Sequence, residues 1–246
     1  KIVLKKVFYK QFMYIYWKIF NYRKKKLRKH KINKDYGHLT NENIFLKIYK
    51  NKVWNKKSNL DFDSGPGSHD LYLVEPYVRA LIDFFIKNKD LTIVDIGCGD
   101  FNVGKQIFKY SRNYIAIDIV QDLIDRNKKK FKADNLIFKK IDVIRQNIPE
   151  GECIIIKEVF QHITNKEINS ILKKIQNFKY IFITESEPLF KFKANIDKQR
   201  GPDCRIDLKS GIIIDKSPFN FRYLEKREIL KIKKEDRYIT TLLYIK

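Results

Sequence analysis

Five short apolar runs rich in Ile and Phe alternate with helical patterns through the middle of this chain. The runs occupy residues 91–96, 114–120, 136–142, 153–157 and 180–185, and residues 103–110, 122–131 and 164–178 between them have helical character. Apolar strands without internal alternation, joined by helices, are typical of a parallel sheet covered on both faces. The sequence therefore predicts an α/β fold.

Both ends of this alternating region carry further elements. The apolar residues that recur at i+3 and i+4 spacing before the first strand are Leu71, Val74, Val78, Leu81 and Phe85. They predict an amphipathic helix with one buried face. Thr164 and Glu167 form a T-x-x-E capping box at the start of the last helix. Residues 228–236 and 237–246 are separated only by a turn, and we expect them to form antiparallel strands at one edge of the sheet.

The positive charge of the chain is concentrated near its start. Residues 1–60 hold 18 Lys and Arg against Asp35 and Glu42, whereas residues 61–246 hold 34 basic and 27 acidic residues. We therefore divide the chain into a basic, aromatic extension, residues 1–60, and a mildly basic domain, residues 61–246. This distribution weakens the case for a domain built to hold nucleic acid.

The extension opens with an aromatic stretch, residues 7–20, that is followed by the basic run 23–31. The stretch is too short and too charged for a membrane span, which needs about 20 apolar residues. It also lacks the small-residue cleavage site of a secretory signal. Three interpretations remain: peripheral contact of residues 1–31 with a membrane, contact with nucleic acid, and a helix packed on the domain.

The composition excludes several classes of protein. An apolar fraction of 43% provides enough material for a core, and 9 Gly and 6 Pro are too few for a collagen-like chain. Cys98, Cys153 and Cys204 lie far apart without C-x-x-C spacing, so we predict neither a disulfide framework nor a metal site. A reducing compartment, the cytoplasm, is the expected location, with the extension as a candidate contact with the inner face of the membrane.

The segment VDIGCGDFNVG, residues 94–104, joins the first strand to a helix. Gly97 and Gly99 allow a sharp turn and a close approach of a ligand, and the helix start offers free backbone amides. Gly104 comes two residues later than the dinucleotide fingerprint G-x-G-x-x-G requires. Asp95 and Asp100 would repel a pyrophosphate but not a zwitterionic ligand with cationic groups. The loop therefore favours a nucleotide-type ligand and argues against a dehydrogenase.

In these residues the chain resembles class I S-adenosylmethionine (SAM) dependent methyltransferases, whose first motif has the form D-x-G-x-G. The resemblance implies a Rossmann-like class I methyltransferase fold, with a mainly parallel seven-stranded sheet and an antiparallel C-terminal edge, and SAM as cofactor. It also implies an acid for the ribose hydroxyls after the second strand, which is Asp118, and an acid near the adenine after the third, which is Asp142. A carboxylate can accept two hydrogen bonds from vicinal hydroxyls.

The cofactor-binding residues that this resemblance implies lie in four segments. They are Asp95, Gly97, Cys98, Gly99, Asp100, Asn102, Asp118, Ile119, Asp142, Val143 and Lys157. Some of them have simpler interpretations: Asp95 as a turn former, Asp118 as a helix cap, Cys98 as filler of a tight loop and Ile119 as a packing residue.

Candidate catalytic residues follow the fourth and fifth strands. Methylation of a hydroxyl needs a base, and Glu158, His162 and Glu185 are the groups available at these strand ends. We choose His162 first, with a packing or capping role as the alternative. Ligands of parallel sheets bind at the carboxyl ends of the strands, where these residues are expected.

A closer resemblance is to a bacterial group of methyltransferases found among surface-polysaccharide genes. Its motifs here are Phe45 with Ile48, Tyr49 and Trp54; SGPGS at 64–68; GCGDFN at 97–102; Gln161 with His162; Asn195 with Asp197, Lys198 and Arg205; and PFN at 218–220. This resemblance implies that 64–68 folds over the cofactor or substrate as a lid, whereas the residues alone indicate a flexible turn that links the extension to the domain. The substrate-binding residues that it implies are Ser64, Ser68, Gln161, Asn195, Asp197 and Arg205.

The predicted function is methyl transfer from SAM by in-line displacement, with a sugar or other small or glycolipid hydroxyl as the first choice of acceptor. Methylation of RNA is the second hypothesis, since the overall charge is +23. A non-catalytic SAM-binding protein is the third.

Overall fold

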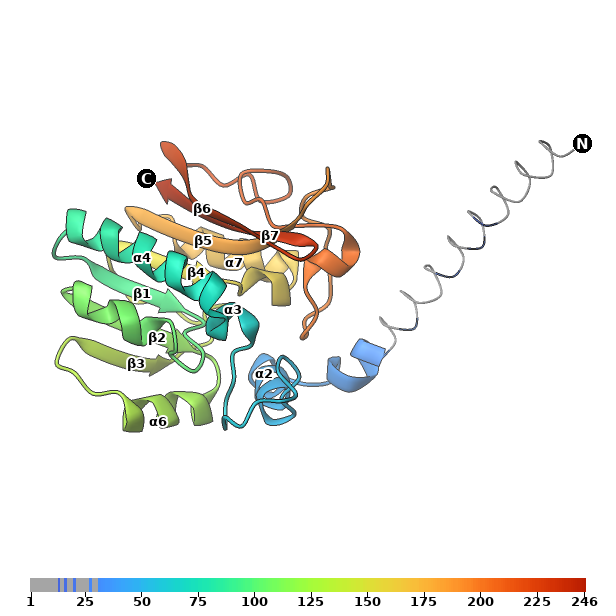
Figure 1. Cartoon of the computed structure of the whole chain (residues 1–246), viewed down its shortest axis with the longest axis horizontal. Coiled ribbons are helices and arrows are strands. Elements are labelled where there is room, and N and C mark those ends of the chain that lie inside the picture. Colours follow the sequence, from blue (N-terminus) through green and yellow to red (C-terminus); the bar gives the residue numbers. More distant parts are fainter. Residues whose placement is uncertain (1–12, 14–15, 17–19, 21–26, 28–30) are drawn as a thin grey trace, which may run out of the picture. The chain divides into compact units, whose positions relative to one another are not determined.

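The computed structural model describes residues 13, 16, 20, 27 and 31–246 (Figure 1). The chain forms two compact units, Lys1–Leu39 and Thr40–Lys246. In the first unit, residues 31–36 are helical. Most of the segment 1–31, for which membrane contact, nucleic-acid contact and packing on the domain are the three interpretations, lies outside the described residues. Among the helices that are described, none has both the length and the apolar character that crossing a bilayer requires.

The second unit is built on a seven-stranded sheet with the strand order β3-β2-β1-β4-β5-β7-β6. The strands are β1 (Thr92–Ile96), β2 (Asn113–Asp118), β3 (Leu136–Lys140), β4 (Cys153–Lys157), β5 (Tyr180–Pro188), β6 (Glu225–Lys234) and β7 (Arg237–Ile245). β1 to β5 pair in parallel, and β7 pairs antiparallel with both β5 and β6. This arrangement confirms the predicted mainly parallel sheet with an antiparallel C-terminal edge.

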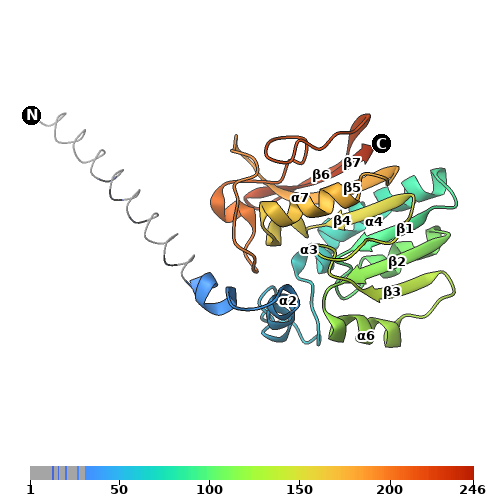
Figure 2. The ribbon, with the colours of Figure 1, turned by 180° about the vertical axis from the view of Figure 1, so that it is seen from behind.

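Helices lie on both faces of this sheet and at the edge where its parallel strands end (Figures 1 and 2). They are α2 (Asn41–Lys50), α3 (Pro66–His69), α4 (Leu71–Lys87), α5 (Gly104–Ile107), α6 (Gln121–Lys130) and α7 (Asn165–Lys174), with 3-10 turns η1 (Phe108–Tyr110), η2 (Phe160–His162) and η3 (Arg205–Leu208). Because side chains alternate along a strand, Ile93 of β1 packs with Leu81 of α4, whereas Val94 packs with Ile171 of α7. Two core layers result, one on each face.

The last helix begins where its capping box predicts and ends earlier than its apolar pattern suggests. The Thr164 side chain accepts from the Glu167 amide, and the Glu167 side chain accepts from the Thr164 amide. The helix stops at Lys174 rather than at residue 178. Phe178 donates its amide to the carbonyl of Ile175 in a turn that keeps both side chains in the core.

Along the sequence, the division between the two compact units falls between Leu39 and Thr40, whereas composition places the boundary after residue 60. Ile44, Ile48 and Tyr49 of α2 are buried, and Tyr49 belongs to one cluster with Val120, which precedes α6, and Leu123 of α6. Residues 40–60 therefore cover the edge of the sheet at which the parallel strands end. Their lysines account for the basic composition of this segment, and its apolar face belongs to the core.

Candidate active site

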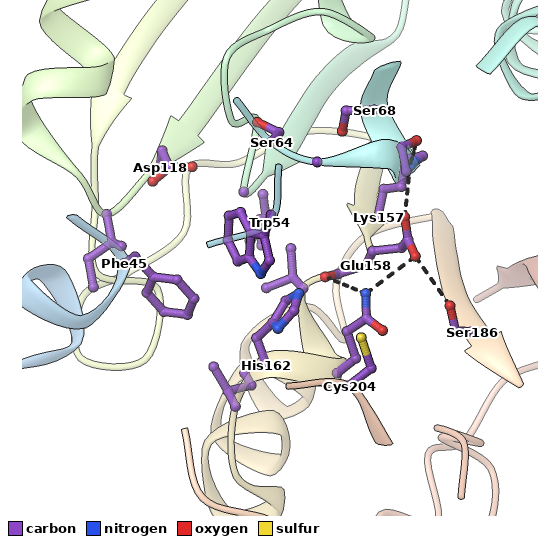
Figure 3. Close-up of a pocket in the computed structure, with 18 of the residues that line it drawn as sticks. Phe45, Trp54, Ser64, Ser68, Asp118, Lys157, Glu158, His162, Ser186 and Cys204 are labelled. Atoms are coloured by element: carbon purple, nitrogen blue, oxygen red, sulfur yellow. Dashed lines mark hydrogen bonds and ion pairs between the residues drawn. The ribbon is translucent and has the colours of Figure 1, made fainter. Parts of the chain in front are cut away.

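A cavity of about 510 Å³ lies at the carboxyl ends of β1, β2, β3 and β4. Its volume is in the range of small-molecule sites. Of the residues that we predicted from the sequence, those that line it are Ser64, Ser68, Gly97, Asp118, Ile119, Asp142, Val143, Lys157, Glu158, Gln161 and His162 (Figure 3). Residues from all four strand ends and from the SGPGS segment thus converge on one space.

The glycine loop needs its glycines. Gly97 and Gly99 both have positive φ, +72° and +56°, which side chains rarely tolerate. A Cβ at Gly97 would overlap Val159, and one at Gly99 would overlap the Ser64 hydroxyl. The loop can therefore pass close to the residues after β4 and to the SGPGS segment.

Asp118 ends β2 and braces this loop. Its carboxylate accepts hydrogen bonds from the amides of Gly99, at 3.2 Å, and Val120, at 3.1 Å. Burial raises the pKa of Asp118 to about 6, so the group is mainly ionised at neutral pH. The carboxylate also lines the cavity, where it can accept further hydrogen bonds from a ligand. Both the expected ligand role and the simpler capping role are compatible with this geometry.

Other predicted cofactor residues lie behind the cavity rather than in its lining. They are Asp95, Cys98, Gly99, Asp100 and Asn102. Asp95 accepts a hydrogen bond from the Tyr114 hydroxyl at 2.9 Å, and burial raises its pKa to about 7. Burial also raises the pKa of the Cys98 thiol, which makes it a packing residue rather than a nucleophile.

The SGPGS segment is fastened to the glycine loop. The Ser64 amide donates to Asp100, and the Asp100 amide donates to the Ser64 hydroxyl at 2.9 Å. The Asn102 side chain donates to the carbonyl of Ser68, and Lys157 Nζ donates to that of Gly67, both at 2.6 Å. A Cβ at Gly67 would overlap the Glu158 carboxylate. The segment therefore forms part of the cavity wall.

His69 adds a charged contact to this fastening that no sequence motif predicted. Its Nε2 lies 2.5 Å from Oδ2 of Asp100 and 3.9 Å from Oδ1 of Asp63. The hydrogen bond to Asp100 raises the pKa of His69. Burial opposes ionisation of Asp100, yet the hydrogen bond and charge of His69 bring its pKa below the ordinary value. The Gly65 and Ser64 amides already engage the same two carboxylate oxygens, so an ion pair explains the cluster.

Replacing His69 with Gln is expected to destabilise the protein more at pH 6 than at pH 9. A raised His69 pKa stabilises the fold below the ordinary value of 6.5, and this contribution disappears as the pH rises through the folded-state pKa. The lowered Asp100 pKa contributes above the ordinary value of 3.8 and is lost on acidification. Thermal unfolding at both pH values measures the difference. His38→Gln, at an exposed position, is the control, and an equal loss at pH 6 and pH 9 would contradict the ion pair.

Glu158 organises the polar part of the cavity wall. Its carboxylate lies 3.3 Å from each of Lys157 Nζ, Gln161 Nε2 and Ser186 Oγ (Figure 3). Burial opposes ionisation, but Lys157 lowers the pKa of Glu158 below its ordinary value, so the group stays a carboxylate. The Oε1 atom of Gln161 is buried without a hydrogen-bond partner within the part of the chain that the structure describes. This wall thus presents hydrogen-bond acceptors.

His162 has a defined protonation state. Its Nδ1 lies 3.2 Å from the carbonyl oxygen of Gly201, and because a carbonyl can only accept, Nδ1 carries the proton. Burial lowers the pKa of His162 to about 4, so the ring is neutral at pH 7 and Nε2 keeps its lone pair. The Trp54 ring lies against it, with centroids 5.0 Å apart. A neutral imidazole in this state can accept a proton.

The predicted catalytic and substrate-binding residues include four that do not line the cavity, and Glu185 is the first of them. β5 continues to Pro188, so Glu185 lies inside the strand, paired with Thr240 of β7, rather than at its end. Its carboxylate accepts from the Phe160 amide at 2.8 Å, and burial raises its pKa to about 8. Glu185 therefore supports the turn that carries His162, through its hydrogen bond with the Phe160 amide.

The other three are residues that we predicted to bind substrate. The Asn195 side chain bonds backbone groups of Ile213 and Ser217. Asp197 accepts from the Asn165 amide. Arg205 is 1% exposed and donates to backbone carbonyls. All three hold polypeptide segments together, because these side chains bond backbone groups, and in the case of Arg205 also the Asn165 side chain, outside the cavity lining.

Part of the lining was not predicted from the sequence. Lys234, Glu235 and Arg237 reach the cavity from the β6–β7 turn, and Cys204 reaches it from the loop before η3. Lys234 pairs with Asp70, and Arg237 pairs with Asp236 at 3.0 Å. Only the pairing of β7 with β5 brings this turn to the site, and no local motif signals it.

The comparisons with curated proteins give two limited similarities, and no family model matches the chain. Glutamyl-tRNA reductase of Wigglesworthia glossinidia brevipalpis is 28% identical over 175 residues, 65% of this chain and 38% of that protein. Ribosomal RNA small subunit methyltransferase A of Mycoplasma capricolum is 29% identical over 73 residues, 30% of this chain and 27% of that protein. The chain therefore spans well under half the length of either relative.

Solved structures show the fold. N-methyltransferase NodS from Bradyrhizobium japonicum, in complex with S-adenosylhomocysteine (SAH), matches with a TM-score of 0.53 and 9% identity over 71% of this chain and 87% of that one. Human N-acetylserotonin methyltransferase, in complex with SAM, matches with a TM-score of 0.52 and 14% identity over 84% and 60%. With the observed strand order, these likenesses establish the class I SAM-dependent methyltransferase fold.

Proposed function

We propose that this chain is a SAM-dependent methyltransferase that methylates a hydroxyl group of a small acceptor, with a saccharide or glycolipid as the first class. The observation that carries the proposal is a single cavity that joins Gly97 and Asp118 with Glu158 and His162. One part of it has the groups to hold a nucleoside, and the other has a neutral base. The structures of NodS with SAH and of human N-acetylserotonin methyltransferase with SAM, which share this fold, support the choice of cofactor.

The residues of the cavity fit this cofactor. Gly97 leaves room for a ligand against the backbone, Asp118 offers a carboxylate to the ribose hydroxyls, and Ile119 and Val143 line the space where an adenine would lie. Asp142 uses one carboxylate oxygen to accept from the Ile144 amide at 3.0 Å, which orders that wall. When bound, SAM supplies an electrophilic methyl group on sulfur.

His162 would remove the proton from the acceptor hydroxyl. Bound SAM would supply the methyl group to the hydroxyl oxygen and would be released as SAH, and Nε2 of His162 would accept the hydroxyl proton as the methyl ether forms. The Glu158 carboxylate favours the charged form of this ring, so it stabilises the imidazolium that forms. The protein must also hold the two reacting atoms about 3 to 3.5 Å apart.

The acceptor side of the cavity favours a molecule rich in hydrogen-bond donors. Gln161 Oε1, the Glu158 carboxylate and His162 Nε2 are all acceptor groups of the lining. The two cations at the β6–β7 turn are already paired with acids, which disfavours an anionic acceptor. The Trp54 ring offers an apolar face. Hydroxyl groups beside an apolar ring face are the chemistry of a saccharide.

RNA is the second candidate acceptor, and one finding favours it. The similarity to a ribosomal RNA methyltransferase covers 73 residues, and the face of Trp54 could also stack on a base.

The basic extension, residues 1–31, belongs to the first proposal. It would engage a saccharide acceptor that is attached to an anionic lipid or lies at a membrane.

The test is transfer of label from methyl-tritiated SAM to nucleotide sugars, lipid-linked saccharides and RNA, each offered to the purified chain. We expect label in a saccharide fraction, and none with the Asp118→Ala variant. Label in RNA that falls steeply with salt would support the second candidate. SAM binding without transfer to any acceptor would contradict both and indicate a non-catalytic SAM-binding protein.

A further inference from the structure

The turn that carries His162, residues 160–163, is held by one buried arginine from a distant part of the chain. Arg205, 1% exposed, donates from Nη1 to the carbonyl of Phe160 at 2.5 Å and from Nη2 to the carbonyl of Ile163 at 3.0 Å. These two carbonyls lie on either side of Gln161 and His162. The guanidinium therefore fixes both ends of the turn.

The segment that carries Arg205, residues 195–205, also contacts His162 directly. The Gly201 amide donates to the carbonyl of His162 at 3.1 Å, and the Gly201 carbonyl lies 3.2 Å from Nδ1 of its ring. The ring orientation thus depends on where residue 201 lies. If the segment moved by about one ångström, the Nδ1 contact would be lost, because hydrogen bonds weaken quickly beyond about 3.2 Å.

Arg205 ties this segment to the start of α7. Its Nη2 donates to Oδ1 of Asn165 at 2.8 Å, and its Nε donates to the carbonyl of Ile196 at 3.3 Å. Asn165 in turn donates its amide to Asp197 and its side chain to the carbonyl of Asn195. Four acceptors around one planar group require the fork of N–H donors that arginine has and lysine lacks.

The charge of Arg205 acts in the same direction as its hydrogen bonds. Burial lowers the pKa of this guanidinium to about 10, so it remains a cation at neutral pH. The positive charges of Lys198 and Arg205 both lower the pKa of His162 and so disfavour its protonated form. The arginine thus supports the neutral ring as well as its orientation.

We propose that Arg205 is a positioning residue that holds His162 with its protonated Nδ1 toward Gly201 and its bare Nε2 available as a base. This inference rests on the proposed function only for the use of that base, since the orientation of the ring stands on its own. It also gives Asn195, Asp197 and Arg205 a shared structural role, because together they place the segment 195–205 against the turn of His162.

The experiment is ¹⁵N NMR of the histidine rings in the full chain labelled with ¹⁵N-histidine, with the His162 signals assigned by their loss in His162→Gln. In the wild type we expect the Nδ1–H tautomer, neutral down to about pH 5. Arg205→Lys keeps the positive charge and loses the fork of N–H donors. In this variant we expect the ¹⁵N shifts of the two ring nitrogens to move toward each other, because both tautomers of the neutral ring become populated. Arg112→Lys is the matched control, because Arg112 donates to Thr92 and Glu152 at the amino end of β1.

A second variant guards against misfolding of the first. Asn165→Ala removes one acceptor of the guanidinium and should shift the His162 ring signals in the same direction by a smaller amount. His162 signals equal to those of the wild type in folded Arg205→Lys, or in Asn165→Ala if the first variant does not fold, would overturn the proposal. This readout needs no acceptor, so absence of methyl transfer would count against the proposed function and leave the positioning result unchanged.

Discussion

Replacing Asp118 with Ala is expected to weaken SAH binding by roughly 100-fold or more, because two hydrogen bonds to a charged acceptor are worth about 3 kcal/mol or more together. The same carboxylate accepts from the Gly99 amide at 3.2 Å, so the glycine loop loses a brace as well. Isothermal titration calorimetry measures the change. Asp118→Asn keeps one acceptor oxygen and should lose less.

Two controls accompany this prediction: a substitution at an exposed site on α6, and the pH dependence of SAH affinity. Asp125→Ala, at an exposed site on α6, should leave SAH affinity unchanged. Burial raises the pKa of Asp118 to about 6, so affinity in the wild type should fall as the pH drops from 7 to 5, and the Asn variant should lack this dependence. Affinity of Asp118→Ala within threefold of the wild type would show that Asp118 only caps the helix.

Replacing His162 with Gln is expected to lower kcat by about 10²- to 10⁴-fold, the usual contribution of a general base. Affinity for SAH should change little, because the residues that would hold the nucleoside come from β1, β2 and the loop after β3. The low pKa of His162, about 4, keeps the ring in its base form above about pH 5. The kcat of the wild type at saturating SAM should therefore be flat from pH 6 to 8 and fall only in acid.

Rate measurements with an acceptor identified by the transfer assay test this prediction. Cys204→Ser is the matched control, since Cys204 also lines the cavity and burial raises its thiol pKa to about 11. It should retain kcat within threefold. A His162→Gln variant with wild-type kcat would make the ring a packing partner of Trp54, which is the alternative that the sequence left open.

Local patterns predicted most of the fold. The parallel strands β1, β2, β4 and β5 stand out because both of their faces are buried. The box of Thr164 and Glu167 marks a helix start by its own hydrogen bonds. The boundary at residue 60 rested on charge. Charge describes the exposed face of α2, whereas Ile44 and Ile48 on its other face decide where the segment packs.

Residues that we predicted to lie at strand ends line the cavity where the structure also places them at a strand end. Asp118 ends β2 and Glu158 follows β4, and both line the cavity. Glu185 does not, because β5 runs three residues further. Arg205 could not be interpreted from its neighbours in sequence, since its partners Phe160 and Ile163 are more than 40 residues away. The role of His69 likewise depends on Asp100, 31 residues later.

Calorimetric titration of SAM, SAH and NADH into the purified chain tests the central claim most directly. We expect micromolar binding of both SAM and SAH and no binding of NADH, because the glycine loop is next to Asp118 and lacks the dinucleotide spacing. Binding of NADH alone, or of none of the three, would contradict the claim that this cavity holds SAM.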